Sequence, residues 1–267
     1  MQIKFWGTRG SCPGSINRSS HYGGNSSCLS VKLAHEDILI LDAGTGIRNC
    51  GNSISGTPEK IHLLLSHLHW DHIQGLPFFA PLFQENREIH IYYPGNDQFK
   101  ERLFSQMDGI RFPISFSELP SQIHFHTDLS ELEKKLNCKV TTIECNHIGE
   151  CFGYRITQNK KSIVYIPDNQ LHKGKPYKHP LRYFVKHCKK TNILIHDSQL
   201  LPSDLPFKEN WGHSLVEDVQ LLAQKSKAEK LVYFHHDPDR DDESINAIVR
   251  TGRESDIAAY DGLELII

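Results

Sequence analysis

Hydrophobic residues along the chain fall into short continuous runs, strictly alternating segments and stretches with helical spacing. The continuous and alternating segments predict strands, because successive side chains of a strand point to opposite faces of a sheet. We expect strands at residues 3–6, 31–33, 38–41, 61–65, 89–93, 139–143, 153–157, 162–166, 192–195, 231–234 and 263–267. Helical spacing predicts helices at 98–107, 214–225 and 243–253, with Ser214 as the N-cap of the second.

Strands and helices alternate in both halves of the sequence, which indicates the α/β fold class. Two β-rich halves, each covered by helices, would form a four-layer αββα sandwich, and we expect a single domain over residues 1–267. A polar turn at 35–37 would join the second and third strands. The irregular, aromatic segment 108–120 is expected to be a packed surface loop, with a lid or specificity loop as the alternative.

The composition of the 267 residues is that of an ordinary globular protein, because 38% are hydrophobic and 23% are charged. The formal net charge of -2 lowers the expectation of a long nucleic-acid partner, which usually requires a basic face. No apolar run approaches the length of a membrane span and no signal peptide is visible, so we expect a cytoplasmic protein without a membrane partner. Seven cysteines without CxxC spacing argue against a disulfide framework and a zinc ribbon.

Three of the 17 histidines directly follow the apolar run at 61–65, in the pattern His-x-His-x-Asp-His. His67 and His69 share one side of an extended segment and can face one metal ion, while Asp71 and His72 on the next turn can face a second. Imidazole and carboxylate suit Zn²⁺, Mn²⁺ or Fe²⁺. The alternative is a polar loop of hydrogen-bonded histidines, but this density of ligands after a buried strand favours the metal site.

This segment resembles the hallmark motif of the metallo-β-lactamase superfamily, and the resemblance extends over its other motifs from Gly7 to about Asp241. Residues 41–46 are similar to the superfamily's strand-Asp-Gly motif, in which Asp42 would orient the metal loop through hydrogen bonds. The resemblance implies one ion held by His67, His69, His147 and Asp168, and a second held by Asp71, His72, Asp168 and His235. It also implies the αββα fold.

The same resemblance implies two divalent ions, with Zn²⁺ expected and Mn²⁺ as the alternative. His236 is an alternative ligand to His235, which we prefer because it directly follows the apolar strand. His69 stands where the oxygen-reducing diiron branch has Glu, so that role is disfavoured. Asp168 stands where the true β-lactamases have Cys, so antibiotic hydrolysis is not expected.

Two segments near the N-terminus, 5–11 and 22–28, resemble superfamily members that act on cyclic nucleotides and cyclic phosphates. The resemblance makes Arg9 and Asn25 candidates for substrate binding. The glycines of both segments would let backbone amides approach an anion, or they would only form tight turns between strands.

The segment 211–214 resembles the His-Ser/Thr motif of the phosphodiesterase and tRNA-processing branches. The resemblance implies that His213 lies beside the scissile phosphate, where it stabilises charge or protonates the leaving oxygen. Asp197 would be the acidic partner that orients His213. The alternative is a histidine that only caps its own helix.

The resemblance therefore implies a binuclear phosphodiesterase that hydrolyses a small, cyclic phosphodiester to a monoester by a metal-bridging hydroxide, with Asp71, Asp197 and His213 in the catalytic machinery. The alternatives are a tRNA 3′-end endonuclease, a thioester or lactone hydrolase of the glyoxalase II type, and a metal-stabilised binding module. The endonucleases carry a protruding Gly- and Lys-rich arm, and no such insertion is visible in the sequence. A homodimer is compatible with the resemblance.

Overall fold

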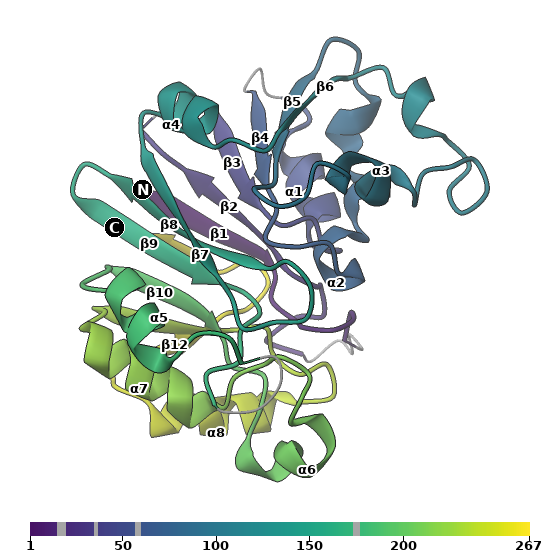
Figure 1. The fold of residues 1–267 in the computed structure, drawn as a ribbon. Helices are drawn as coiled ribbons and strands as arrows, with labels where there is room; N and C mark the ends of the chain where they lie inside the picture. Colours follow the sequence, from purple (N-terminus) through teal and green to yellow (C-terminus); the bar gives the residue numbers. More distant parts are fainter. Residues whose placement is uncertain (15–19, 35–36, 57–59, 173–176) are drawn as a thin grey trace.

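Two β-sheets pack face to face in the computed structural model, which describes residues 1–14, 20–34, 37–56, 60–172 and 177–267 (Figure 1). The sheets have the strand orders β13-β1-β2-β3-β4-β5-β6 and β12-β11-β10-β9-β8-β7. The first sheet contains β1 (Gln2–Gly7), β2 (Cys28–Lys32), β3 (Ile38–Leu41), β4 (Ile61–Leu64), β5 (Glu88–Tyr92), β6 (Gln122–His126) and β13 (Glu264–Ile266). The second sheet contains β7 (Lys139–Glu144), β8 (Phe152–Gln158), β9 (Lys161–Ile166), β10 (Ile193–Asp197), β11 (Lys230–Phe234) and β12 (Ile257–Ala258).

Most of the helices lie on the outer faces of the two sheets, whereas α4 (Ser130–Leu136) packs its two buried leucines into the core between the sheets (Figure 1). The helices are α1 (Ile47–Ile54), α2 (Trp70–Ile73), α3 (Phe99–Phe104), α4 (Ser130–Leu136), α5 (Leu181–His187), α6 (Leu205–Lys208), α7 (Val216–Ser226) and α8 (Asp242–Thr251). Short 3₁₀ segments occur at Leu76–Phe78, Ala80–Phe83, Phe116–Glu118 and Pro202–Asp204. Among the described residues, no helix has the length and apolar character needed to cross a bilayer.

Three apolar cores separate the four layers of the fold. The central core lies between the sheets, where the ring of Phe5 on β1 is 6.2 Å from that of Phe234 on β11. A second core joins the first sheet to α1 and α3, and a third joins the second sheet to α5, α7 and α8. Each sheet is thus buried on both faces, and the predicted αββα sandwich is confirmed.

Strand direction brings several loops to one edge of the sandwich. The strands β9, β10 and β11 are parallel, and β7 runs in the same direction because both β7 and β9 are antiparallel to β8. The strands β3 and β4 are also parallel to each other. The segments that follow these carboxyl ends are therefore neighbours, which is where open α/β sheets usually place their sites.

Seven of the described strands and α-helices lie in segments where the hydrophobic pattern predicts neither a strand nor a helix: α1, α2, α4, α5, α6, β6 and β12. The edge strand β6 is only partly buried, so its residues lack the apolar run of a central strand. The sequence of α4 is Ser-Glu-Leu-Glu-Lys-Lys-Leu, and only its two leucines are buried. Such short elements are stabilised by packing rather than by a strong pattern of their own.

Other predicted elements differ in extent. The helix α3 ends at Phe104, earlier than predicted, and the loop that includes 108–120 projects from the molecule between α3 and β6 (Figure 1). Ser214 is not an N-cap, because α7 begins at Val216 and the Ser214 hydroxyl donates to the carbonyl of Asn169. Of the turn predicted at 35–37, residues 35–36 lie outside the described residues.

Candidate active site

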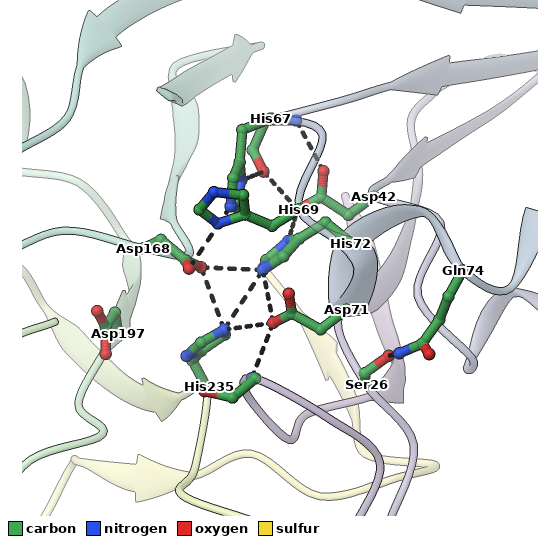
Figure 2. Close-up of polar contacts among 12 residues, drawn as sticks. Ser26, Asp42, His67, His69, Asp71, His72, Gln74, Asp168, Asp197 and His235 are labelled. Carbon is green, nitrogen blue, oxygen red and sulfur yellow. Dashed lines mark hydrogen bonds and ion pairs between the residues drawn. The ribbon is translucent and has the colours of Figure 1, made fainter. Parts of the chain in front are cut away.

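The His-x-His-x-Asp-His segment lies at the edge where the loops converge (Figure 2). It follows β4 and continues into α2, which carries Asp71 and His72. Asp168 lies just after β9, and His235 directly follows β11. The two sheets therefore supply opposite sides of one cluster, as Figure 2 shows for His72, Asp168 and His235.

His67, His69, His147 and Asp168 form a first group, in which one candidate ligand atom of each residue lies within 4.8 Å of the others. His69 Nδ1 is 3.0 Å from His147 Nε2. Asp168 Oδ2 is 3.4 Å from His147 Nε2 and 3.6 Å from His67 Nε2. Because Zn–N bonds measure ~2.0–2.1 Å, a tetrahedral ion holds its ligand nitrogens about 3.3 Å apart. The first group therefore has the spacing of one ligand shell.

Asp71, His72, Asp168 and His235 form a second group with the same property, and Asp168 belongs to both groups. Asp168 Oδ1 is 3.0 Å from His72 Nε2 and 3.2 Å from His235 Nε2. Asp71 Oδ2 is 3.2 Å and 3.1 Å from the same two nitrogens. Asp168 thus presents one oxygen to each group, as a carboxylate shared by two ions would.

The neighbouring His236 lies outside this cluster. Its Nε2 donates to the carbonyl of Ala259, 2.9 Å away. His235 has a positive φ of 59° and so adopts the left-handed conformation, which is rare for a residue with a β-carbon. This turn at the end of β11 directs His235 and not His236 into the second group.

Asp42 orients the metal loop without belonging to either group. Its Oδ2 is 2.8 Å from His72 Nδ1 and accepts hydrogen bonds from the hydroxyls of Ser66 and Tyr165. Its Oδ1 accepts a hydrogen bond of 2.7 Å from the Ser66 amide. Asp42 thus makes the hydrogen bonds expected of a residue that orients His72 and the loop at Ser66. Tyr165 was not identified from the sequence, because its hydroxyl reaches Asp42 only when the two sheets pack face to face.

Several polar atoms inside the cluster have no hydrogen-bond partner among the described residues. These atoms are His67 Nε2, His235 Nδ1 and Asp168 Oδ1, of which Asp168 Oδ1 has ion-pair contacts of 3.0 Å and 3.2 Å with His72 and His235. All three residues are at least 98% buried, and leaving a buried polar atom unpaired costs about 1–3 kcal/mol. Since His67 Nε2 and Asp168 Oδ1 point into the two ligand groups, divalent ions there would satisfy them. The residues therefore fit a two-metal centre.

The electrostatics of the cluster also favour cations. Burial lowers the pKa of His67 well below its ordinary value, which keeps that imidazole neutral and able to bind a metal. Burial acts in the same direction on His72, but the carboxylates of Asp168 and Asp71 raise its pKa well above the ordinary value. Burial would raise the pKa of Asp168, yet the imidazoles of His235 and His72 hold it well below its usual range. The second group thus strongly attracts positive charge.

Beside both groups lies a buried pair formed by His213 and Asp197. His213 Nδ1 is 2.9 Å from Asp197 Oδ2, and the rings of His147 and His235 lie 5.3 Å and 5.0 Å from the ring of His213. Asp197 also accepts hydrogen bonds from the amides of Asn169 and Gln199. The structure therefore brings together the two residues that the sequence suggested as an oriented histidine.

Two glycines leave room for His147 and His235, which belong to the two candidate ligand groups. A β-carbon at Gly212 would lie 2.4 Å from His147 Nδ1, and the φ of +85° at this position also favours glycine. The Gly212 carbonyl accepts a hydrogen bond of 2.9 Å from His147 Nδ1, so the same residue orients the ring. A β-carbon at Gly10 would lie 2.2 Å from His235 Nδ1. The amide of the next residue, Ser11, donates to Asp71 Oδ2 at 2.8 Å.

Arg9 does not point into the ligand cluster. It is 3% exposed, and its guanidinium donates to the backbone carbonyls of Gly23, Asp237 and Arg240 at 2.7–3.0 Å. The surface hollow that Arg9 lines is about 570 Å³ in volume, and its acidic residues outnumber its two cations, Arg9 and Arg240, which disfavours a phosphate. The acidic residues of this hollow are Asp239, Asp241, Asp242 and Glu243. In this arrangement Arg9 holds loops together.

Asn25 is likewise engaged within the protein. Its Nδ2 donates to Asp261 Oδ2 at 2.9 Å, and its Oδ1 accepts from the Thr45 hydroxyl at 3.1 Å. The amide of Gly24 also donates to the Asp261 carboxylate, and the amide of Gly10 donates to the carbonyl of His236. Two of the glycine amides that could have approached an anion are therefore used in turns, and the polar groups of Asn25 and Arg9 are engaged within the protein.

A hollow of about 480 Å³ adjoins the first ligand group, within the size range of small-molecule sites. The metal-ligand candidates His67 and His69 form one wall, and Trp70 is 78% exposed beside them. The other lining residues are Leu68, Ile73, Tyr93, Asn96, Phe99, Arg102, Ile148, Gly149 and Glu150. Sequence reasoning missed this hollow. The signal in the sequence that could have indicated it was Trp70, a large aromatic residue inside the His-x-His-x-Asp-His segment.

Comparison with known proteins agrees with this geometry. The family model described as "Beta-lactamase superfamily domain" matches residues 38–236, which include every metal-ligand candidate. The chain belongs to the metallo-β-lactamase superfamily. Ribonuclease Z of Streptococcus pneumoniae is 34% identical over 171 residues, covering 59% of this chain and 50% of that protein. The chain, a member of this superfamily, therefore spans about half the length of the curated relatives that it matches.

Solved structures show the same fold across nearly the whole chain. The metallo-β-lactamase fold protein YhfI of Bacillus subtilis is 16% identical with a TM-score of 0.69, covering 99% of both chains. A diphosphatase of the PhnP family is 19% identical with a TM-score of 0.70, covering 100% of this chain and 97% of its own. The short form of human tRNase Z is 19% identical with a TM-score of 0.64, covering 100% and 99%. At these identities the likeness shows the fold.

Proposed function

We propose that this protein is a two-metal phosphodiesterase that hydrolyses a small, cyclic phosphodiester to a monoester. The observation that carries the proposal is the buried pair of His213 and Asp197 beside two ligand groups that share Asp168. A metal-stabilised binding module has no need of an oriented histidine next to its metals. A thioester or lactone hydrolase would use the ligand groups but leaves the histidine pair without a role.

Zn²⁺ is the metal that we propose, with Mn²⁺ as the alternative, because imidazole and carboxylate ligands suit both. Two such ions, when bound, lower the pKa of a coordinated water and neutralise charge on the phosphoryl oxygens. Asp168 would hold both ions at a fixed separation. The hydrogen bonds from His72 to Asp42 and from His147 to the Gly212 carbonyl keep these ligand rings in place.

His213 is the proposed general acid. Its Nδ1 is held by Asp197, which leaves Nε2 as the ring nitrogen for the substrate. In the proposed step, the oxygen of a hydroxide derived from water forms a bond to phosphorus, the bond from phosphorus to the leaving sugar oxygen breaks, and the proton on His213 Nε2 moves to that leaving oxygen. The buried carboxylate of Asp197 stabilises the protonated ring before the transfer.

The hollow beside His67 and His69 is the proposed place for the non-reacting part of the substrate. An indole that is 78% exposed is costly in water and gains contact area when a planar ring stacks on it. Arg102 on α3 also lines the hollow and can pair with a second anionic group. These side chains suit a substrate with an aromatic base, such as a cyclic nucleotide.

An assay of the purified protein loaded with Zn²⁺ or Mn²⁺ tests this function. The panel contains bis(p-nitrophenyl) phosphate, 2′,3′- and 3′,5′-cyclic nucleotides, a sugar cyclic phosphate, a thioester and a tRNA precursor with a 3′ trailer. We expect hydrolysis of a small diester to one monoester. If the protein binds two ions per chain and hydrolyses no diester, the proposal fails, and activity on the thioester would then identify the glyoxalase II type.

Trp70→Ala should raise KM for a cyclic nucleotide by about tenfold, because base stacking on an aromatic ring contributes about 1–3 kcal/mol. The proposed metal ligands His69 and Asp71, which flank Trp70 in the sequence, are unchanged in this variant. We therefore expect kcat to change by less than about twofold. Steady-state kinetics with the nucleotide and with a sugar cyclic phosphate measure both constants. Ile266→Ala, which removes an equally exposed apolar side chain from the edge strand β13, is the control. An unchanged KM would show that the base does not stack on Trp70.

A tRNA 3′-end endonuclease is the second candidate, favoured by the identity of 34% to Ribonuclease Z. The loop between α3 and β6 is the projecting segment that could grip RNA, but residues 105–121 contain a single basic residue. That residue, Arg111, forms an ion pair of 2.7 Å with Asp108. RNA binding requires several free cations, so the small diester is the preferred substrate. A kcat/KM for the tRNA precursor far above that for every small diester would reverse this choice.

A further inference from the structure

A second cluster of histidines lies on the inner face of the seven-stranded sheet. His62, His90 and His124 are direct partners across β4, β5 and β6, and His126 is two residues further along β6 on the same face. His62 precedes His67 by five positions, so the two lie about 16 Å apart along the extended chain. The surrounding positions on this face belong to the apolar core between the sheets. These histidines therefore interrupt a hydrophobic face where packing alone favours apolar side chains.

Two of these imidazoles approach one carboxylate on α4. His90 Nδ1 is 3.0 Å from His126 Nε2, and His126 Nδ1 is 3.1 Å from Glu131 Oε2. One candidate ligand atom from each of the three residues lies within 4.8 Å of the others. The separation of His90 Nδ1 from His126 Nε2 is close to the roughly 3.3 Å between ligand nitrogens on a tetrahedral zinc ion. Glu131 contacts the other nitrogen of His126, so its half-exposed carboxylate has to rotate to reach an ion held by the two imidazoles.

Lys135 provides the positive charge at this place. Its Nζ is 3.0 Å from His90 Nε2 and 3.0 Å from Glu131 Oε1, which lies one turn earlier on α4. The Lys135 side chain is 27% exposed, so it can turn into water without disturbing the core. The Glu131 side chain is 47% exposed, which gives an ion a path from solvent.

We propose that His90, His126 and Glu131 form a further binding site for a divalent transition-metal ion such as Zn²⁺, which competes with the ammonium group of Lys135 for the carboxylate of Glu131. Two imidazoles, one carboxylate and a water complete a four-coordinate shell. The three ligands come from β5, β6 and α4, so the ion fixes α4 to the edge of the sheet. The site is independent of the proposed phosphodiesterase activity, because it shares no residue with the two ligand groups that contain Asp168.

A neighbouring group of Glu88, His90 and His124 has similar spacing but is less suited to the ion. Glu88 Oε2 forms an ion pair of 2.7 Å with Lys60, and Glu88 Oε1 is 2.7 Å from His90 Nε2. Its carboxylate is therefore held by cationic and polar partners on the sheet itself. Glu88 can hydrogen-bond to the ring of His90 and so orient it toward the ion.

Equilibrium dialysis of the full chain against Zn²⁺, followed by mass-spectrometric measurement of bound zinc, tests the site. We expect the wild-type protein to bind one zinc per chain more than His126→Ala, with equal hydrolysis of any small diester. Lys135→Met should keep the additional ion and bind it roughly fivefold more tightly, because the competing ammonium is gone. His179→Ala is the matched control, since His179 and Lys178 both contact Glu144, and within the part of the chain that the structure describes no second imidazole joins this surface group.

Two results would overturn the proposal. The first is equal zinc content in the wild-type protein and His126→Ala. The second is a Lys135→Met protein that unfolds at a lower temperature and binds zinc no more tightly than the wild-type protein. Such a result would mean that Lys135 is a permanent structural cation and not a competitor of the metal ion. Neither result depends on whether the protein hydrolyses a phosphodiester, so a failure here is distinguishable from a failure of the proposed function.

Discussion

Asp168→Asn should reduce kcat/KM for a small phosphodiester by about a thousandfold or more. Asp168 is the residue common to both ligand groups, and the amide that replaces it is neutral and presents one weak oxygen ligand. Loss of the metal pair removes several kcal/mol of transition-state stabilisation, and each 1.36 kcal/mol corresponds to about a tenfold change in rate. We expect bound metal to fall below two ions per chain, as measured by mass spectrometry on the same sample used for kinetics.

Asp256→Asn is the matched control, because Asp256 is also buried and paired but lies away from the cluster. It is 3% exposed and contacts Arg253 and the amide of Leu231. This variant should lower the unfolding temperature while both metals and the activity remain. Retention of two ions and of the wild-type rate in Asp168→Asn would contradict the assignment of Asp168 as the shared ligand.

His213→Ala should slow hydrolysis of a cyclic nucleotide by a factor of about 10²–10⁴, the usual contribution of a positioned general acid. The loss should be much smaller for bis(p-nitrophenyl) phosphate, because p-nitrophenolate leaves readily without a proton whereas a sugar alkoxide does not. Metal content should stay at the wild-type value, since His213 is in neither of the two groups that share Asp168. The comparison of kcat for the two substrates thus separates proton donation from loss of the metals.

Asp197→Asn should reproduce part of this selective loss, because an amide no longer stabilises the protonated ring of His213. His187→Ala, which removes a histidine from α5 on the outer face of the second sheet, is the control and should leave both rates unchanged. An equal loss on both substrates, with metals retained, would assign His213 to phosphate binding rather than to proton donation.

Local sequence was sufficient to predict those strands, helices and candidate ligands that are defined by a few neighbouring residues. The apolar run before His67 predicts a buried strand, and the spacing through His72 predicts two nearby ligand positions. The more distant His147 and His235 were placed only through the resemblance to the superfamily. Their meeting requires β7, β9 and β11 to end at one edge, which depends on strand direction and not on any local pattern.

Tertiary structure alone decided the properties that depend on which segments become neighbours. Arg9 resembles an anion-binding residue in sequence, yet the folded chain surrounds its guanidinium with backbone carbonyls. Trp70 lies within the metal motif, but only the fold leaves its ring exposed beside a hollow. The ladder of His62, His90 and His124 exists only because β4, β5 and β6 pair in this register. Hydrophobic periodicity determines where strands and helices form, whereas non-local packing and strand pairing determine which side chains meet.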